Sequence, residues 1–187
     1  GSATIKIENS DGCYAEKQIT VAAAPTIDAG MSNSVCIGSQ VTLSASGADT
    51  YSWTSSTGQT VSQGVAFTPT ATATYTVTGT NLAGCTGTDT RTITLNPIPT
   101  VTPFLSETTI CFGETVTLSA SGADSYTWKD ANGDPIASST FTPSTSGTQT
   151  LTVVGTTNSC SSTSTKDLIV NPKPTISGPS SVKPSED

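Results

Sequence analysis

The sequence lacks histidine altogether and has few aromatic or charged residues. With no histidine in 187 residues, an imidazole base for a serine or cysteine nucleophile, a histidine zinc ligand and a histidine proton switch are all excluded. Only 11% of the residues are charged, and the net charge of −7 comes from scarce basic residues. This balance argues against nucleic acid or an anionic membrane as a partner. No apolar run approaches the roughly 20 residues of a spanning helix, so we expect no membrane insertion.

What the sequence does contain is a stretch that occurs twice. Residues 41–49 read VTLSASGAD, and residues 116–124 read the same. A tyrosine and a tryptophan follow each copy, at Tyr51 and Trp53 and at Tyr126 and Trp128. Apolar residues alternate with threonine and serine, which is typical of a strand with one buried face. Ser-Gly-Ala-Asp is typical of a tight turn. Each copy therefore predicts a strand, a tight turn and a second strand that carries large aromatic side chains.

The repeat also divides the chain into domains. Three pairs of residues are each 75 positions apart: Cys36 and Cys111, Trp53 and Trp128, Cys85 and Cys160. Asn-Pro-x-Pro segments, which stiffen a linker, occupy residues 96–99 and 171–174. We therefore predict repeat 1 over residues 25–98 and repeat 2 over residues 99–173. Residues 1–24 are predicted to form the C-terminal hairpin of a preceding partial repeat, and residues 174–187 the start of a further repeat.

Each complete repeat contains six or seven short strand patterns separated by turn signals, as in a β-sandwich. In repeat 1 we predict strands near residues 34–36, 40–46, 51–54, 65–68, 72–80 and 88–95. The fold class is therefore all-β, with tandem immunoglobulin-like β-sandwich repeats. Strand alternation puts the tyrosine and tryptophan of each repeat on one face, most simply the core face, and a sugar-stacking platform is the alternative. The predicted core residues are Leu43, Tyr51, Trp53, Leu118, Tyr126 and Trp128.

The order of the motifs resembles a known family. The motifs of repeat 1 are Cys-x-Gly-x-x-Val-Thr-Leu at residues 36–43, Tyr-x-Trp at 51–53, Phe-Thr-Pro at 67–69, Thr-Tyr-x-Val at 74–77, Gly-Cys at 84–85 and Ile-Thr-Leu-Asn-Pro at 93–97. In repeat 2, Leu151 replaces Tyr75 and Ser159 replaces Gly84. The series resembles the tandem immunoglobulin-like and PKD-like repeats of secreted Bacteroidota proteins, including giant cell-surface adhesins of gliding bacteria. The resemblance implies stalks, adhesive arrays or spacers without shared catalytic residues, exported by the type IX secretion route to the cell surface or medium.

Five cysteines are distributed as one in the partial repeat and two in each complete repeat. Two cysteines in each complete repeat favour the disulfides Cys36–Cys85 and Cys111–Cys160, which leave Cys13 without a partner. In standard immunoglobulin topology, however, the two cysteines of one repeat lie at opposite ends. A bond between adjacent repeats, Cys36 to Cys160, and free thiols therefore remain open. No Cys-x-x-Cys pair occurs, so zinc and redox roles are not expected.

One loop spaces oxygen-bearing side chains as calcium-binding loops do, at Asp130, Asn132 and Asp134. The alternative is an Asn-Gly turn between two strands, with solvated acids beside it. The corresponding residues 55–59 of repeat 1 contain no carboxylate. We expect no cofactor, and calcium at this loop is the one candidate.

These features favour a non-catalytic structural or adhesive segment, an extended stalk or spacer of a large secreted cell-surface protein. Its expected partners are neighbouring repeats, with surface polysaccharide or other cell-surface proteins as further candidates. The alternative is an accessory or carbohydrate-binding module of a secreted polysaccharide-degrading enzyme, which exposed coplanar aromatics would support. An enzyme is not expected, because isolated acids on strand edges form neither paired carboxylates nor an activated nucleophile.

Overall fold

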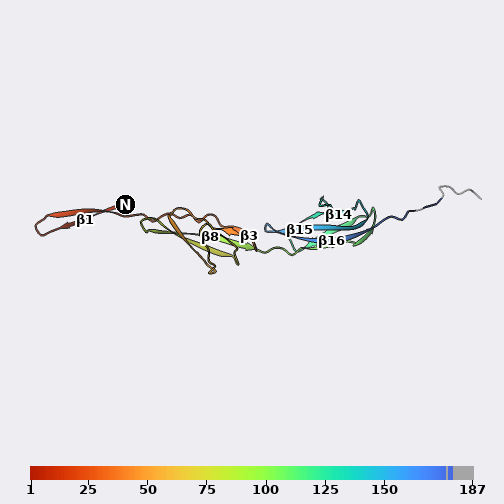
Figure 1. Ribbon diagram of the computed structural model, residues 1–187, viewed down its shortest axis with the longest axis horizontal. Helices are drawn as coiled ribbons and strands as arrows, with labels where there is room; N and C mark the ends of the chain where they lie inside the picture. The colour runs from red at the N-terminus through yellow and green to blue at the C-terminus, as the bar shows by residue number, and fades with distance from the viewer. Residues whose placement is uncertain (176, 179–187) are drawn as a thin grey trace, which may run out of the picture. The chain divides into compact units, whose positions relative to one another are not determined.

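The computed structural model describes residues 1–175 and 177–178, and every regular element in that part of the chain is a β-strand. The chain divides into two compact units, unit 1 (Gly1–Pro97) and unit 2 (Ile98–Asp187). Figure 1 shows their strands along the chain. Each unit contains an immunoglobulin-like β-sandwich, so the predicted fold class is confirmed. The predicted start of a further repeat, residues 174–187, lies largely outside the described residues.

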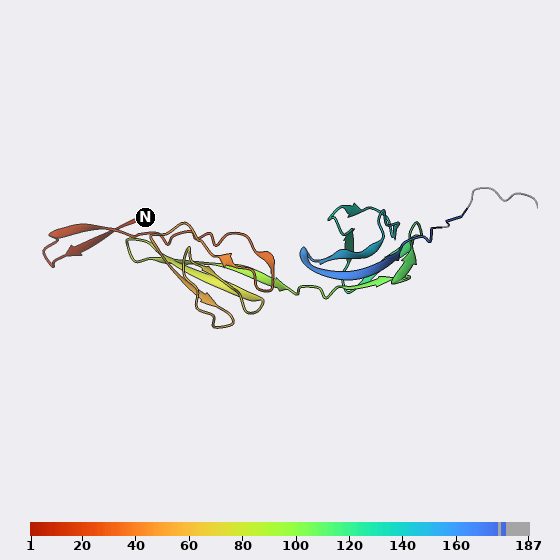
Figure 2. The same ribbon diagram turned by 45° about the vertical axis from the view of Figure 1, so that its right-hand side comes forward.

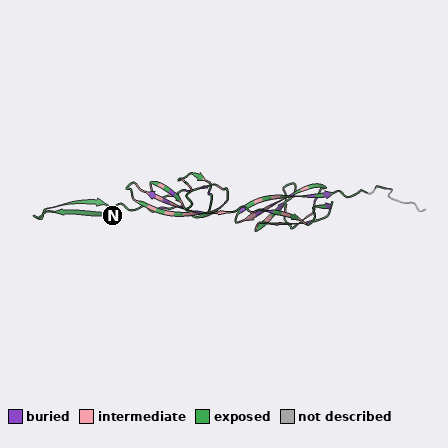
Figure 3. Cartoon of the chain, turned by 90° about the horizontal axis from the view of Figure 1, so that it is seen from below, coloured by how far each residue is buried: buried purple, intermediate pink, exposed green. Residues whose placement is uncertain are grey.

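Unit 1 begins with a two-stranded hairpin. Strands β1 (Ser2–Glu8) and β2 (Tyr14–Thr20) pair antiparallel, with Ser2 opposite Thr20. Every residue of both strands is exposed, and Figure 3 shows the whole hairpin in green. Neither face of this hairpin is buried, although apolar and polar residues alternate along its strands.

The sandwich of unit 1 consists of a four-stranded and a two-stranded sheet. The larger sheet has the order β3 (Asn33–Cys36), β8 (Thr86–Asn96), β7 (Ala73–Thr80) and β5 (Thr50–Ser55), and the smaller has β4 (Val41–Thr42) and β6 (Ala66–Phe67). Strand β3 runs parallel to β8, and the other pairs are antiparallel. The buried core residues are Ile27, Ala29, Val41, Leu43, Trp53, Ala73, Tyr75, Val77 and Ile93.

Unit 2 has the same layout with more complete pairing. One sheet has the order β10 (Thr109–Cys111), β16 (Cys160–Asn171), β15 (Gly147–Thr157), β12 (Ser125–Lys129) and β13 (Pro135–Ile136), and the other has β14 (Thr140–Phe141), β11 (Val116–Ser121) and β9 (Thr102–Leu105). Figure 2 shows β15 and β16 in blue as a long, curved hairpin. The buried core residues are Val101, Ile110, Val116, Leu118, Trp128, Leu151, Val153, Leu168 and Val170.

The glycine of the repeated SGAD segment is required by a close approach of the backbone. Gly47 has a φ of 103°, and a β-carbon at this position would collide with the carbonyl oxygen of Thr26. Gly122 has a φ of 95°, and a β-carbon there would collide with the carbonyl oxygen of Thr100. Glycine fits both the left-handed conformation and the contact, which explains why this turn occurs unchanged in both units.

The tyrosine after each turn is bonded to that turn. The Tyr51 hydroxyl donates to the carbonyl oxygen of Ala48 at 2.7 Å and accepts from its N–H at 2.8 Å. Tyr126 makes the same pair of bonds to Ala123. Both tyrosines are half-buried and pack against the cores, which also contain the buried residues Leu43, Leu118, Trp53 and Trp128. The repeated stretch therefore builds the fold.

One predicted strand of repeat 1 differs from the structure. The pattern predicts a strand over residues 40–46, but β4 contains Val41 and Thr42 alone, whereas β11 of unit 2 has six residues. In unit 1 the side chain of Gln63 bonds both backbone groups of Ala45, where a neighbouring strand would otherwise pair. The segment before it adds a single bridge, Asp28 to Ser46, in place of a strand equivalent to β9.

Candidate functional site

The structure does not contain the disulfides that were predicted from the number of cysteines in each repeat. Cys36 and Cys160 are disulfide-bonded, whereas Cys13, Cys85 and Cys111 are free thiols. The predicted bonds Cys36–Cys85 and Cys111–Cys160 are therefore wrong.

The reason lies in the topology of each sandwich. Cys36 pairs in register with Asn96 at the end of β8, whereas Cys85 directly precedes the start of β8. At about 3.3 Å per residue, the length of β8 separates these two positions by roughly 35 Å. A disulfide needs α-carbons within about 7 Å of each other. The same holds in unit 2, because Cys111 pairs with the last residue of β16 and Cys160 is its first.

The loop considered for calcium is a closed turn. One carboxylate oxygen of Asp130, Oδ1, accepts the N–H groups of Asn132 and Asp134, both at 2.9 Å. Asn9 and Asn81 build the same arrangement in unit 1, bonding the N–H groups two and four residues later. The spacing of the acids is thus the spacing of this turn. Among residues 1–175 and 177–178 no group of three His, Cys, Asp or Glu residues is placed to hold a metal ion, and calcium stays a prediction.

A hydrogen-bonded glutamine lies beside the tryptophan of unit 1. Gln63 Oε1 accepts from the indole Nε1 of Trp53 at 2.8 Å and from the N–H of Ala45 at 3.1 Å. Its Nε2 donates to the carbonyl oxygen of Ala45 at 2.8 Å. Sequence reasoning missed this residue, because a single glutamine between two strand patterns carries no signal of its own.

Unit 2 lacks this glutamine. Between Val61 and Phe67 repeat 1 has five residues, whereas repeat 2 has four between Ile136 and Phe141, and none of them carries a side-chain amide. A cleft of about 290 Å³ lies beside Trp128 in unit 2. Its lining residues are Leu118, Ser119, Ala120, Tyr126, Trp128, Ile136, Ala137, Ser138 and Ser139. The Trp128 indole N–H makes no hydrogen bond with the described residues.

The cleft has no group suited to acid–base chemistry. Tyr126 is the one titratable residue in its lining, and the Tyr126 hydroxyl already bonds Ala123. What remains is an indole N–H and serine hydroxyls in an apolar hollow. Such a lining can accept an uncharged group with a hydrogen-bond acceptor, and its chemistry favours binding over catalysis.

One carboxylate holds the first segment of the unit 1 sandwich in place. Asp89 Oδ2 accepts from the N–H of Ala29 at 2.7 Å, and Oδ1 accepts from the N–H of Thr90 at 2.8 Å. These two backbone donors, Ala29 first, lower the pKa of Asp89. In the core, burial raises the pKa of Tyr75, and a side-chain hydrogen bond from Ser55 opposes the rise.

Comparison with known proteins adds structural likeness alone. No family model and no curated protein matches the chain. Two titin domains in complex with telethonin are 19% identical with a TM-score of 0.35, over 83% of this chain and 100% of that chain. The N-terminal eight immunoglobulin domains of the Down Syndrome Cell Adhesion Molecule are 15% identical with a TM-score of 0.48, over 92% of this chain and 27% of that one. Tandem immunoglobulin repeats of Dlar are 17% identical with a TM-score of 0.33, over 81% of this chain and 100% of that one.

No helix in the described part of the chain is long and apolar enough to cross a membrane.

Proposed function

We propose that this chain is a non-catalytic structural or adhesive repeat segment, serving as an extended stalk or spacer of a large secreted cell-surface protein. The proposal rests on one observation: the residues that recur in both units stabilise the sandwich in which they lie. The glycine, alanine, tyrosine and tryptophan that recur in both units each bond or pack within their own sandwich. A sequence that repeats its folding residues suits a protein whose task is to multiply one domain.

The outer faces of the sandwiches support this proposal. On the larger sheet of unit 1, hydroxyl side chains are aligned across β5, β7 and β8 in three rows. The rows are Thr50, Thr80 and Thr86; Ser52, Thr78 and Thr88; and Thr54, Thr76 and Thr90. Cross-strand threonine pairs stabilise a sheet and keep its outer face hydrated without charge. An uncharged, hydrated face suits a spacer whose sides must not associate non-specifically with other surfaces.

The resemblance to Bacteroidota repeats extends the proposal to location and partners. It implies export by the type IX secretion route to the cell surface, as in the giant adhesins of gliding bacteria. The partners proposed are neighbouring repeats of the same chain. Surface polysaccharide and other cell-surface proteins are the further partners that an adhesive role would require.

Small-angle X-ray scattering tests the spacer role. Strands of about 3.3 Å per residue make one sandwich roughly 35–40 Å long, so a spacer should reach a maximum dimension of roughly 80–100 Å. Replacing Pro97 and Pro99 by glycine should broaden the distance distribution, because the linker loses its restriction of φ. A maximum dimension near 60 Å for the unmodified chain contradicts the spacer function.

The second candidate is an accessory or carbohydrate-binding module. The hydroxyl rows of unit 1 are the observation that favours it, because a regular array of hydroxyl groups can bond to an ordered polysaccharide surface. Co-sedimentation with insoluble polysaccharide tests it, with Thr78→Lys in the middle of the rows and Thr127→Lys on β12 of unit 2 as the matched control. Retention that Thr78→Lys alone abolishes supports the module, and equal sedimentation of the chain with and without polysaccharide excludes it.

A further inference from the structure

The cleft of unit 2 contains a backbone edge of β11 that no strand covers. Strand β14 pairs with β11 at Val116 and Thr117 alone, and the N–H of Leu118 then donates to the carbonyl oxygen of Ser139 at 2.7 Å. The backbone groups of an antiparallel strand point alternately to its two edges. Those of Ala120, two residues after Leu118, therefore point to the same edge as the Leu118 N–H. Ala120 and Ser139 both line the cleft, so the N–H and carbonyl groups of Ala120 face into it.

The pairing on the other edge of β11 leads to the same result. The N–H of Ser106 donates to the carbonyl oxygen of Thr117 at 3.0 Å, so Thr117 and every second residue after it bond toward β9. Ala120 is not one of these residues, and it lies opposite Pro103, which has no N–H. In the described part of the chain, neither backbone group of Ala120 thus has a hydrogen-bond partner.

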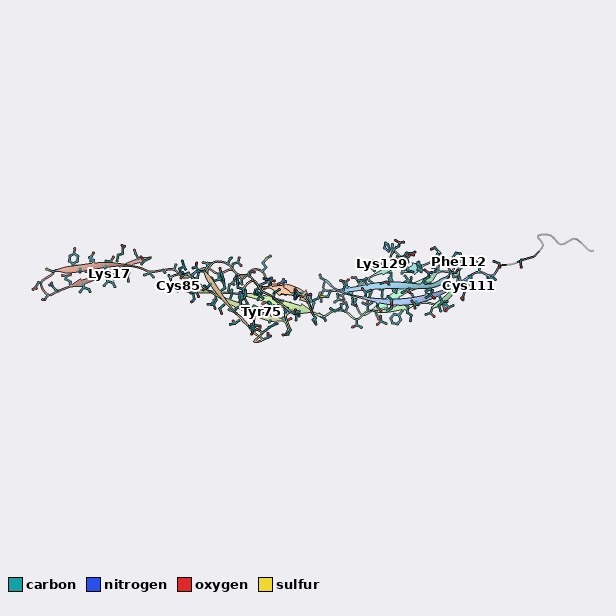
Figure 4. All side chains as sticks on the ribbon, in the orientation of Figure 1. Lys17, Tyr75, Cys85, Cys111, Phe112 and Lys129 are labelled. Atoms are coloured by element: carbon teal, nitrogen blue, oxygen red, sulfur yellow. The ribbon has the colours of Figure 1, made fainter. Side chains whose placement is uncertain are left out.

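The indole N–H of Trp128 is a second donor in the cleft. Trp128 is 7% exposed, and its nitrogen has no hydrogen-bond partner among the described residues. Over the same residues, Arg91 Nε is the one buried side-chain nitrogen or oxygen without a partner. The Trp128 nitrogen therefore belongs to the exposed part of the ring, which lines the cleft. Figure 4 labels Lys129, the residue after Trp128 on β12, and so locates this part of unit 2.

Unit 1 shows which chemical group satisfies these two donors and one acceptor. Trp53 and Ala45 are the residues 75 positions before Trp128 and Ala120. The oxygen of the Gln63 carboxamide accepts from the Trp53 indole and from the Ala45 N–H, and its nitrogen donates to the Ala45 carbonyl oxygen. A primary carboxamide holds its oxygen and one N–H side by side. It therefore bonds both backbone groups of one strand residue, as a neighbouring strand would.

We propose that the cleft of unit 2 binds the side chain of a glutamine in a peptide. The amide oxygen accepts from the Trp128 indole and from the Ala120 N–H, and the amide nitrogen donates to the Ala120 carbonyl oxygen. The alkyl stem lies against Leu118 and Ile136, which also line the cleft. Its volume of about 290 Å³ is several times the roughly 30 Å³ that a water molecule occupies in the liquid, so stem and amide both fit. The site lies within unit 2 and is independent of the spacer function.

The same groups discriminate against related ligands. A carboxylate would bring a second oxygen against the Ala120 carbonyl oxygen, and no described residue of the lining carries a positive charge to compensate. A secondary amide, such as a peptide bond or the N-acetyl group of an amino sugar, is almost always trans and points its C=O and N–H in opposite directions. It can therefore not bond both backbone groups of Ala120 at once. The arrangement selects a primary carboxamide.

Proton–nitrogen correlation NMR of the full chain tests the site, with N-acetylglutamine N-methylamide as the probe. The resonances of the Trp128 indole N–H and the Ala120 N–H should shift and reach saturation. The Trp53 indole resonance is the internal control and should stay, because Gln63 already bonds it. The matched glutamate and methionine probes should bind at least about tenfold more weakly, because each loses a hydrogen bond and leaves the Ala120 carbonyl group unpaired.

Two variants of the chain sharpen the measurement. Trp128→Phe keeps an aromatic ring but removes the N–H, so the glutamine probe should bind about tenfold more weakly when the Ala120 resonance is followed. Gln63→Ala opens the corresponding position of unit 1, whose geometry is known. In this variant the probe should also shift the Trp53 indole resonance, which shows that a free carboxamide can replace the missing side chain.

Three results would overturn the proposal. The first is the absence of a saturable shift of the Trp128 indole resonance with the glutamine probe. The second is equal affinity for the glutamine, glutamate and methionine probes, which would mean an unselective apolar hollow. The third is binding of N-acetylglucosamine in preference to the glutamine probe, which would make the cleft a carbohydrate site. Scattering dimensions report on the spacer function alone, so either proposal can fail while the other stands.

Discussion

Replacing Gln63 tests whether a side chain completes the smaller sheet of unit 1. Gln63 makes three hydrogen bonds, one to the Trp53 indole and two to the backbone of Ala45. Each net hydrogen bond contributes about 1 kcal/mol, and a buried donor left without a partner costs about 1–3 kcal/mol. Since Trp53 is 8% exposed, its N–H would lose its partner inside the core. We expect Gln63→Met, which keeps the volume, to lower the free energy of unfolding of unit 1 by about 2–3 kcal/mol.

Gln59 provides the matched control. It is also half-buried: its Nε2 donates to the carbonyl oxygen of Thr68 at 2.7 Å, and its Oε1 accepts a longer bond, 3.4 Å, from the Tyr75 hydroxyl. Gln59 bonds neither Trp53 nor the backbone of the smaller sheet, so Gln59→Met should cost about 1 kcal/mol, less than Gln63→Met. Urea unfolding followed by Trp53 fluorescence measures both variants in a Trp128→Phe background, in which unit 1 carries the remaining tryptophan. If Gln63→Met unfolds within about 0.5 kcal/mol of the control, water replaces the amide and the reasoning is refuted.

Two further predictions concern the core tryptophans and the Asp89 carboxylate. Trp53→Ala and Trp128→Ala should each destabilise their own unit by about 3–5 kcal/mol, a large part of a small domain's stability, and calorimetry that shows less than a two-degree shift would mean an exposed ring. Asp89→Asn should lower the urea midpoint of unit 1 at pH 7. Because its backbone donors depress the pKa of Asp89, the stabilisation is present above the ordinary aspartate pKa and is lost as pH falls through the lower folded value. The midpoints of variant and parent should converge once the pH has fallen below the folded pKa of Asp89, and a difference that stays constant with pH would contradict the linkage.

The parts of the fold that sequence reasoning predicted correctly are those set by local alternation. Along β7 every second residue from Ala73 to Gly79 is buried, because one face of a strand is read directly from a period of two. Leu43 and Trp53 could be placed in the core for the same reason. The length of β4 could not be predicted, because its missing backbone partner is a glutamine side chain that comes 18 residues after Ala45 in the sequence.

The candidate sites were less predictable because they depend on distances across the sandwich. Counting two cysteines per repeat says nothing about which end of β8 each occupies, and that placement rules out a bond within the repeat. The acidic loop was ambiguous for a related reason. An Asx turn and a calcium loop both place oxygen atoms at every second residue, and the sequence alone cannot show that Asp130 Oδ1 accepts hydrogen bonds from the N–H groups of Asn132 and Asp134.

The two units use one layout, but unit 1 makes contacts at two core positions that unit 2 lacks. Unit 1 buries Tyr75 completely, with its ring 5.4 Å from that of Phe67, where unit 2 has Leu151. Unit 1 also satisfies its tryptophan with Gln63, where unit 2 has a cleft. A domain of this size buries only about 60% of its unfolded surface, so such losses weigh heavily on it. In a repeat array, stability is the sum of each domain's own packing and its links to its neighbours.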